Sequence, residues 1–205
     1  MKKNHPNDPR QTIRREIRAF RKILSDEQRA ESSAKIVQRF AQLTAFQAAT
    51  RIAGYLAFDG EADPLELMRI AVNQGQSVYV PIMVNKSQPL LFAPWLPGMP
   101  MKTNAFGIAE PDLPRSEWIP AKHLDFVIQP LVAFDDRGHR LGVGAGYYDR
   151  SFAFLNQLSD ATSRPTRLVG FAFELQRVES IARQPWDVEL DGVVTEWNVY
   201  GQSGG

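Results

Sequence analysis

Hydrophobic residues near the start of the chain recur with the spacing of an α-helix. Ile13, Ile17, Phe20 and Leu24 follow one another every three or four residues, which predicts one apolar stripe on a helix that begins near Arg10. Arginines recur at the same spacing on a neighbouring face of this helix, namely Arg10, Arg14, Arg18 and Arg21. Charged faces of this kind are usually solvated, and the pattern alone favours that interpretation.

A second helix is predicted directly after the first. Ser25 is suited to cap a helix N-terminus, and Gln28 stands three residues later, which completes the sequence pattern of a capping box. We expect this helix to run over residues 26–43. The boundary between the two helices is therefore set at Ser25.

The following segment has the pattern of a strand, a crossover helix and a second strand. Residues 51–58 (RIAGYLAF) and 77–81 (SVYVP) read as strands. Between them, residues 65–73 have helical periodicity, with Pro64 placed at the first turn and Gly75 as a C-terminal cap. This order predicts parallel pairing of the two strands with a right-handed connection.

The rest of the chain continues the alternation less regularly. Strands are predicted over 90–95, 124–130, 167–173 and 192–195, a helix over 147–158, and a proline-rich loop between 94 and 120. The pattern predicts an α/β fold: a single-domain, three-layer α/β/α architecture with a mostly parallel open sheet, which is Rossmann-like. We expect the domain to span residues 10–200, between a disordered lead-in over 1–9 and a flexible tail over 201–205.

Composition narrows the classes of function. Hydrophobic residues make up 43% of the chain, charged residues 23%, and the net charge is +1, so nothing global favours a nucleic acid or membrane partner. The absence of cysteine excludes disulfides, thiolate catalysis and cysteine-ligated zinc. The polar start and the lack of a long apolar run predict a cytoplasmic location. We expect a monomer.

The most informative stretch is RLGVGAGYYD, from Arg140 to Asp149. Its alternating glycines let the backbone turn tightly, so that amide N–H groups can converge on an anion at the start of the predicted helix. Arg140 could supply a forked positive charge to phosphate, and Asp149 could hold a magnesium ion. The spacing is neither a Walker A loop nor the usual dinucleotide fingerprint. A bare Gly-x-Gly-x-Gly is often only a tight turn.

Taken with its paired tyrosines and the following aspartate, this string resembles the signature of the 5-formyltetrahydrofolate cyclo-ligases, also called methenyltetrahydrofolate synthetases. The resemblance covers the chain from about Arg10 to Thr195. Four further blocks carry it: RQTIRR at 10–15, YLAFDGE at 55–61, FGIAEP at 106–111, and PWD at 185–187 through VVT at 193–195. Five blocks in this order are far more specific than any one of them.

The resemblance implies roles for individual residues. ATP would be bound by Arg10, Arg14, Arg140, Gly142, Gly144, Ala145, Gly146, Tyr147 and Tyr148. The folate would be bound by Leu56, Glu61, Val143, Gly144, Ala145, Gly146 and Tyr147. Magnesium would be held by Asp149 and Asp187. The catalytic set would be Glu61, Arg140 and Tyr147.

The chain departs from the family pattern at two places. Arg10 stands where the family often has lysine, which keeps the charge but changes its geometry. Val143 and Ala145 stand between the glycines, where some members have basic residues. Phosphate binding would therefore depend more on Arg140, Arg14 and magnesium.

The implied reaction converts 5-formyltetrahydrofolate and ATP to 5,10-methenyltetrahydrofolate, ADP and phosphate. Two other classes of function stay open on sequence grounds. One is a different α/β enzyme, acting on a phosphorylated or CoA-ester metabolite. The other is an RNA-binding module that uses the arginine-rich helix, which would show strong salt-dependent affinity. Individual residues also have simpler interpretations; Asp149, for example, could cap a helix or pair with Arg150.

Overall fold

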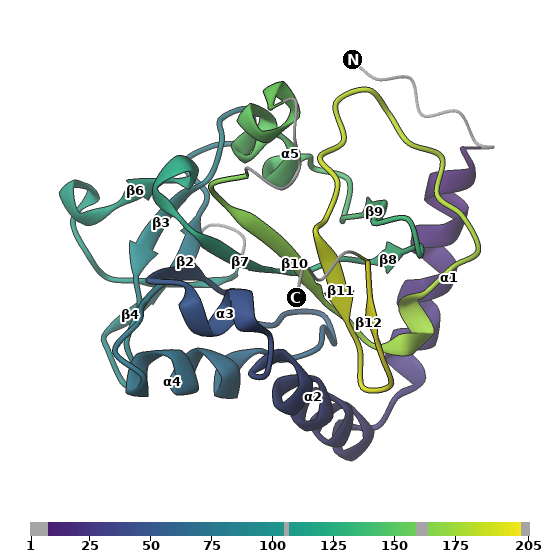
Figure 1. Ribbon diagram of the computed structural model, residues 1–205, viewed down its shortest axis with the longest axis horizontal. Coiled ribbons are helices and arrows are strands. Elements are labelled where there is room, and N and C mark those ends of the chain that lie inside the picture. The colour runs from purple at the N-terminus through teal and green to yellow at the C-terminus, as the bar shows by residue number, and fades with distance from the viewer. Residues whose placement is uncertain (1–7, 105–106, 159–163, 202–205) are drawn as a thin grey trace.

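The computed structural model of the chain describes residues 8–104, 107–158 and 164–201. One twisted sheet crosses the molecule, with helices packed against its faces and α1 standing at one side (Figure 1). The strands of this sheet lie in the order β12-β11-β10-β7-β1-β2-β3-β6. The predicted lead-in and tail fall mostly on residues 1–7 and 202–205, which lie outside the described ranges.

The centre of the sheet is parallel and its edges are antiparallel. The parallel strands are β2 (Ser77–Ile82), β1 (Arg51–Ala53), β7 (Phe126–Gln129), β10 (Arg167–Phe171) and β11 (Gly192–Val194). The antiparallel edge strands are β12 (Val199–Tyr200) on one side and β3 (Leu91–Pro94) and β6 (Ile119–Pro120) on the other. The predicted mostly parallel α/β sheet is confirmed.

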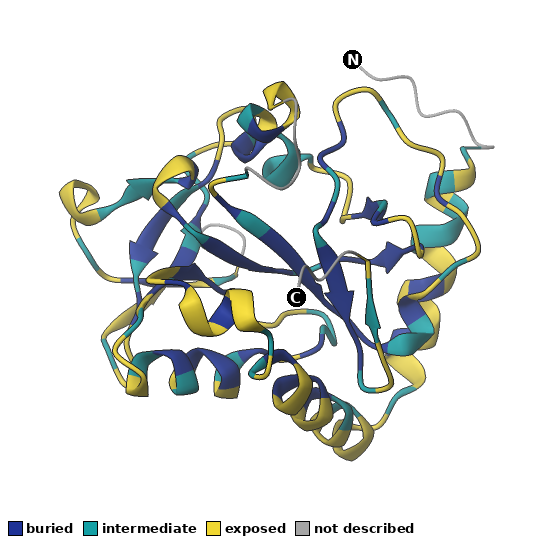
Figure 2. Cartoon of the chain, in the orientation of Figure 1, coloured by how far each residue is buried: buried dark blue, intermediate teal, exposed yellow. Residues whose placement is uncertain are grey.

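Alternating side chains of the buried strands form two separate cores. Ile52 and Phe126 point to the face covered by α2 (Asp26–Phe40), α3 (Thr44–Ala48) and α4 (Leu65–Asn73). Their neighbours Ala53 and Val127 point to the other face, which is covered by short helices and loops. The central strands are buried along their length (Figure 2), as expected for parallel strands covered on both faces.

The N-terminal helices form close to where the sequence places them. Helix α1 runs over Pro9–Ile23, with Asp8 as its N-cap, and α2 begins after Ser25 with the predicted capping box. Helix α4 has the predicted bounds, whereas α2 ends at Phe40 rather than at residue 43. The predicted apolar stripe of α1 is wrong at Phe20, which is 55% exposed, while Ile17 of the same helix is buried.

Two predicted elements are shorter than expected. The strand predicted over 51–58 ends at Ala53, because the chain then leaves the sheet and turns through Asp59 and Gly60, both at positive φ. The helix predicted over 147–158 is divided into α5 (Tyr147–Ser151) and a 3-10 segment, Ala153–Gln157. The break lies at Phe152, whose φ of −109° and ψ of 12° are not helical and whose side chain is fully buried.

Several short elements were not predicted from the sequence. The proline-rich segment expected to be a loop contains a hairpin of β4 (Met101–Thr103) and β5 (Ala109–Pro111), together with β6. A second small hairpin joins β8 (Ala133–Phe134) to β9 (Arg140–Leu141). Helix α1 packs against β8 and against the 3-10 turn Glu174–Gln176, which brings its arginines next to the glycine-rich segment.

Candidate active site

The candidate site lies at the topological switch point of the sheet. Strand β1 lies between β2 and β7, and the chain continues from β1 to β2 on one side and later from β7 to β10 on the other. Ligands in open α/β sheets bind outside the carboxyl ends of the strands at such a point. Two segments converge here: the acid loop, residues 54–62 after β1, and the glycine loop, residues 142–146 after β9.

The glycine loop presents its backbone to solvent. Gly144 has a φ of +103° and Gly146 a φ of +68°, which side chains with a Cβ rarely adopt, so these glycines fix the path of the loop. Residues 142–145 are exposed. No amide N–H from 142 to 146 donates to an acceptor within the described part of the chain. The loop therefore offers a set of free donors suited to an anion.

Two arginines hold the glycine loop from opposite sides. The Arg14 Nε atom donates to the carbonyl oxygen of Gly142 at 2.8 Å. The Arg150 Nη1 atom donates to the carbonyl oxygen of Ala145 at 2.8 Å, and its guanidinium lies 4.9 Å from the centre of the Tyr147 ring. Arg150 does not pair with Asp149, which was one of the simpler interpretations of that carboxylate. The contact of Arg150 with the glycine loop was not predicted, because the spacing of residues in the sequence does not reveal a hydrogen bond to a backbone carbonyl.

Arg140 is buried and is engaged by protein groups. Its guanidinium donates to Asp149 Oδ1 at 2.8 Å and to the carbonyl oxygen of Val188. In the amide orientation that satisfies both groups, the Gln129 oxygen accepts from Nη2 of Arg140 at 3.1 Å. Burial lowers the pKa of Arg140, and the charges of Asp149 and Asp187 oppose that shift. In this arrangement Arg140 orients Asp149, whereas Arg14 is the arginine that lies over the glycine loop.

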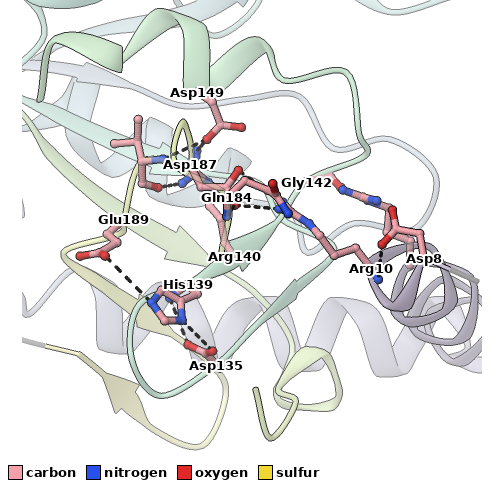
Figure 3. A network of polar contacts seen from close by, with 12 residues as sticks. Asp8, Arg10, Asp135, His139, Arg140, Gly142, Asp149, Gln184, Asp187 and Glu189 are labelled. Carbon is pink, nitrogen blue, oxygen red and sulfur yellow. Dashed lines mark hydrogen bonds and ion pairs between the residues drawn. The ribbon is translucent and has the colours of Figure 1, made fainter. Parts of the chain in front are cut away.

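The two carboxylates expected to bind magnesium are brought to one place (Figure 3). Asp149 Oδ1 also accepts from the N–H of Val188 at 3.2 Å, so Asp149 lies beside the residue that follows Asp187. Asp187 forms an ion pair with Arg10 at 2.9 Å. The Asp149 Oδ2 atom accepts no hydrogen bond from the described residues. A magnesium ion is commonly held by one or two carboxylates and substrate phosphates, and these two fit that pattern.

The acid loop carries a half-buried carboxylate, that of Glu61. Phe58 donates its N–H to Glu61 Oε2 at 3.2 Å, and Glu61 donates its own N–H to the Phe58 carbonyl at 3.1 Å. The buried Tyr55 hydroxyl donates to the carbonyl oxygen of Ala62 and ties the loop back to its start. Burial raises the pKa of Glu61, and the nearby Arg21 opposes that rise. Such a carboxylate is suited to accept hydrogen bonds from N–H groups of a ligand.

Tyr148 links the two loops. It is the second residue of α5, stacks on Phe152, and has its pKa raised by burial and further by the negative charge of Glu61. The two loops are also joined through α1, because Arg14 donates to Gly142 of the glycine loop and Arg18 donates to Asp59 of the acid loop. Leu56 is half-buried on the acid loop, and Val143 is 62% exposed on the glycine loop, so apolar surface is present on both sides.

The arginine row of α1 is turned towards the protein, contrary to the solvated face favoured by the pattern alone. Arg10 and Arg14 contact the segments that carry Asp187 and Gly142, while Arg18 and Arg21 both contact Asp59 of the acid loop. The helix is therefore a scaffold for both loops rather than a free basic surface. Arg18 and Arg21 were not predicted as site residues.

Comparison with known proteins identifies the family of the chain. Residues 6–196 match the model of the 5-formyltetrahydrofolate cyclo-ligase family. The chain belongs to this family. The 5-formyltetrahydrofolate cyclo-ligase of Haemophilus influenzae is 38% identical over 182 residues, which cover 88% of this chain and 94% of that protein. The cyclo-ligase of Escherichia coli K12 is 35% identical over 185 residues, or 90% and 98% of the two chains.

A solved structure supports the same membership. The 5,10-methenyltetrahydrofolate synthetase of Aquifex aeolicus superposes with a TM-score of 0.77 at 29% identity, covering 96% of this chain and 94% of that one. The family resemblance seen in the sequence is thereby confirmed. The roles of individual residues in this cyclo-ligase family member stay predictions. Among its described helices, none has the length and apolar character that crossing a membrane requires.

Proposed function

We propose that this chain catalyses the ATP-dependent conversion of 5-formyltetrahydrofolate to 5,10-methenyltetrahydrofolate, with release of ADP and phosphate. The observation that carries the proposal is the convergence of two loops at the switch point of the sheet. One is the exposed, donor-rich glycine loop, and the other is the acid loop with its half-buried carboxylate. These loops differ in chemistry as the two substrates do. One substrate is a polyanion, and the other has a heterocycle rich in N–H groups.

The glycine loop would bind the phosphates of ATP. Its free amides from Gly142 to Gly146 supply donors, and Arg14 and Arg10 supply positive charge from α1. Burial, and secondarily repulsion from Arg10, lower the pKa of Arg14, so an anion placed between these arginines would relieve their repulsion. Tyr147 and Tyr148 follow directly and would line the same ligand.

The acid loop would bind the folate. Glu61 would accept hydrogen bonds from the pterin, and Leu56 would cover an apolar face of the ring. Val143 and Tyr147 would enclose it from the other loop. The formyl group would then lie beside the glycine loop, near residues 144–146, where the transferred phosphate is also bound.

The reaction proceeds in two steps by this proposal. The formyl oxygen first attacks the γ-phosphorus of ATP, and the bond to the ADP oxygen breaks. The folate N10 then attacks the activated formyl carbon, the C–O bond breaks, and phosphate leaves with the N10 proton. No side chain forms a covalent bond, so the protein acts by positioning the substrates and by stabilising charge.

Asp149 and Asp187 would hold the magnesium ion that accompanies ATP. A bound magnesium ion would neutralise phosphate charge. Asp149 is oriented for this role by Arg140, and Asp187 by Arg10 and by the N–H of Gln184 at 2.9 Å. Arg140 contributes as a positioning residue in this account.

The test is a spectrophotometric assay of methenyltetrahydrofolate formed from 5-formyltetrahydrofolate. We expect product only when both ATP and magnesium are present. Product formed without ATP, or none from folded protein that binds ATP, would contradict the proposal. The second result would direct attention to phosphorylated or CoA-ester substrates.

A further inference from the structure

Arg21 is an unusual residue of the arginine row. It is 1% exposed, although it lies in an amphipathic helix at the edge of the molecule. Its Nη2 atom donates to the carbonyl oxygen of Asp59 at 2.8 Å and lies 3.6 Å from the Asp59 carboxylate. Its Nε and Nη1 atoms have no hydrogen-bond partner among the described residues. A buried guanidinium with unused donors is costly, and stability alone gives no reason to keep it.

The backbone that Arg21 contacts is itself strained. Asp59 has a φ of +52°, and it is the one residue other than glycine with a positive φ in the described ranges. Gly60 follows with a φ of +73°. This pair reverses the chain between Phe58, which donates to the Glu61 carboxylate, and Glu61 itself. Strain of this kind persists where surrounding contacts fix it, often at functional sites.

From these contacts we infer that Arg21 is a positioning residue for folate binding, which holds the acid loop so that Glu61 faces the substrate as a charged carboxylate. The inference rests on the proposed function. Arg21 does not touch the folate in this account. It acts through the Asp59 carbonyl, which belongs to the turn before Glu61, and through its positive charge, which favours the ionised form of Glu61.

The charges around Glu61 agree with this role. Arg21 and Arg18 of α1 favour its ionised form, and Asp59 of the loop opposes it. Tyr55 and Tyr148 are neutral neighbours whose pKa values are raised first by burial and then by the negative charge of Glu61. Among these neighbours Arg21 opposes the effect of burial most strongly, because Arg18 lies further out on the helix with 46% of its side chain exposed.

The decisive variants are Arg21→Met and Arg18→Met. Methionine can fill the space of the arginine stem but carries neither the charge nor the donors of arginine. Arg18→Met is a matched control on the same face, since it removes a contact with the Asp59 side chain but none with the backbone carbonyl. Arg21→Lys retains the positive charge and tests whether that charge, without the guanidinium, is sufficient to keep Glu61 ionised.

We expect Arg21→Met to raise the KM for 5-formyltetrahydrofolate about tenfold, with the KM for ATP within about twofold of the parent. The acid limb of its kcat/KM profile should move to higher pH, because Glu61 loses the charge that favours its ionised form. Arg21→Lys should restore the position of that limb in part. Arg18→Met should change the KM for the folate and the KM for ATP by less than about twofold.

An equal rise in both KM values, or an unchanged pH profile in a folded Arg21→Met protein, would overturn the inference. If Arg21→Met does not fold, Arg21→Lys decides: a raised KM for the folate alone, with the acid limb moved part of the way to higher pH, supports the inference, and equal KM changes or an unmoved limb overturn it. Parent protein that forms no methenyl product would instead refute the proposed function, so the two failures are distinguishable.

Discussion

The glycine loop and the acid loop meet at one site but are built in opposite ways. The glycine loop is exposed and presents backbone donors for which the described ranges of the chain supply no acceptor. The acid loop half-buries its carboxylate, which accepts from a backbone N–H, and a tyrosine hydroxyl and an arginine bind carbonyl oxygens of the loop. Open donors suit a polyanion that brings its own charge and metal, whereas a half-buried acceptor suits a ligand that donates hydrogen bonds.

One helix supports both loops, and its arginines differ accordingly. Arg14 is half-buried and donates from Nε to the Gly142 carbonyl of the glycine loop. Arg21 is enclosed and supports the acid loop from behind. The arginines of α1 therefore have different roles, although their spacing in the sequence is regular. Each role is set by the segment that the arginine contacts.

The largest effect is expected at the carboxylates beside the glycine loop. Asp149→Asn keeps an acceptor for Arg140 but removes the charge that would hold magnesium, so kcat should fall about 100-fold or more. Steady-state kinetics over a magnesium titration would measure this loss. Asp136→Asn, an exposed carboxylate paired with Arg177 far from the site, is the control. Normal magnesium dependence in Asp149→Asn would disprove the metal role.

A substitution in the acid loop should weaken the binding of the folate and leave the binding of ATP nearly unchanged. Glu61→Gln removes a half-buried charged acceptor, which is worth about 1.5–3 kcal/mol in a hydrogen bond to a ligand. We expect the KM for 5-formyltetrahydrofolate to rise about 10- to 100-fold with little change for ATP. A comparable loss of ATP affinity would show that the two loops are not separate in function.

A side chain added to the glycine loop should strain its backbone at Gly144 but not at Gly142. Gly144→Ala places a Cβ at a φ of +103°, whereas Gly142→Ala has an ordinary φ and no atom within 4 Å of the added carbon. Strain of about 1–2 kcal/mol should lower the melting temperature of the first variant only, and its KM for ATP should rise about tenfold. Equal melting temperatures for the two variants would contradict this account of the loop.

The smallest predicted effect concerns the stability of the acid loop. Burial raises the pKa of Glu61, so its ionised form costs stability as pH rises from the ordinary carboxyl pKa of about 4.3 through the folded value. Glu61→Gln should therefore melt at a higher temperature than the parent at pH 7, and the difference should shrink towards pH 4.5. Thermal melts across this range would measure it. A difference independent of pH would point to packing instead.

The sequence predicted the scaffold well, because periodicity reports burial directly. The α4 helix and the β2, β7 and β10 strands follow from local patterns, and the capping box fixed the start of α2. The β8–β9 hairpin was not predicted, because strands of two residues are too short to show periodicity. The end of α5 before Phe152 was not predicted either, because tertiary packing decides that Phe152 is buried.

The site could be predicted in part for a similar reason. The glycine string and Asp149 stand together in the chain, so their proximity was visible. Arg18, Arg21 and Gln129 contact the site from elements distant in the sequence, and no local pattern identifies them. Arg140 was expected at the phosphates but lies buried, because the segment around Val188 covers it, and covering segments cannot be inferred from spacing.

The central claim is that ATP and folate depend on different loops held by one helix. The most direct test is calorimetric titration of Arg14→Met and Glu61→Gln with magnesium ADP and, separately, with 5-formyltetrahydrofolate. We predict that Arg14→Met loses about tenfold in affinity for ADP alone and Glu61→Gln at least as much for the folate alone. Loss of both ligands in each variant, or the reverse pattern, would contradict the claim.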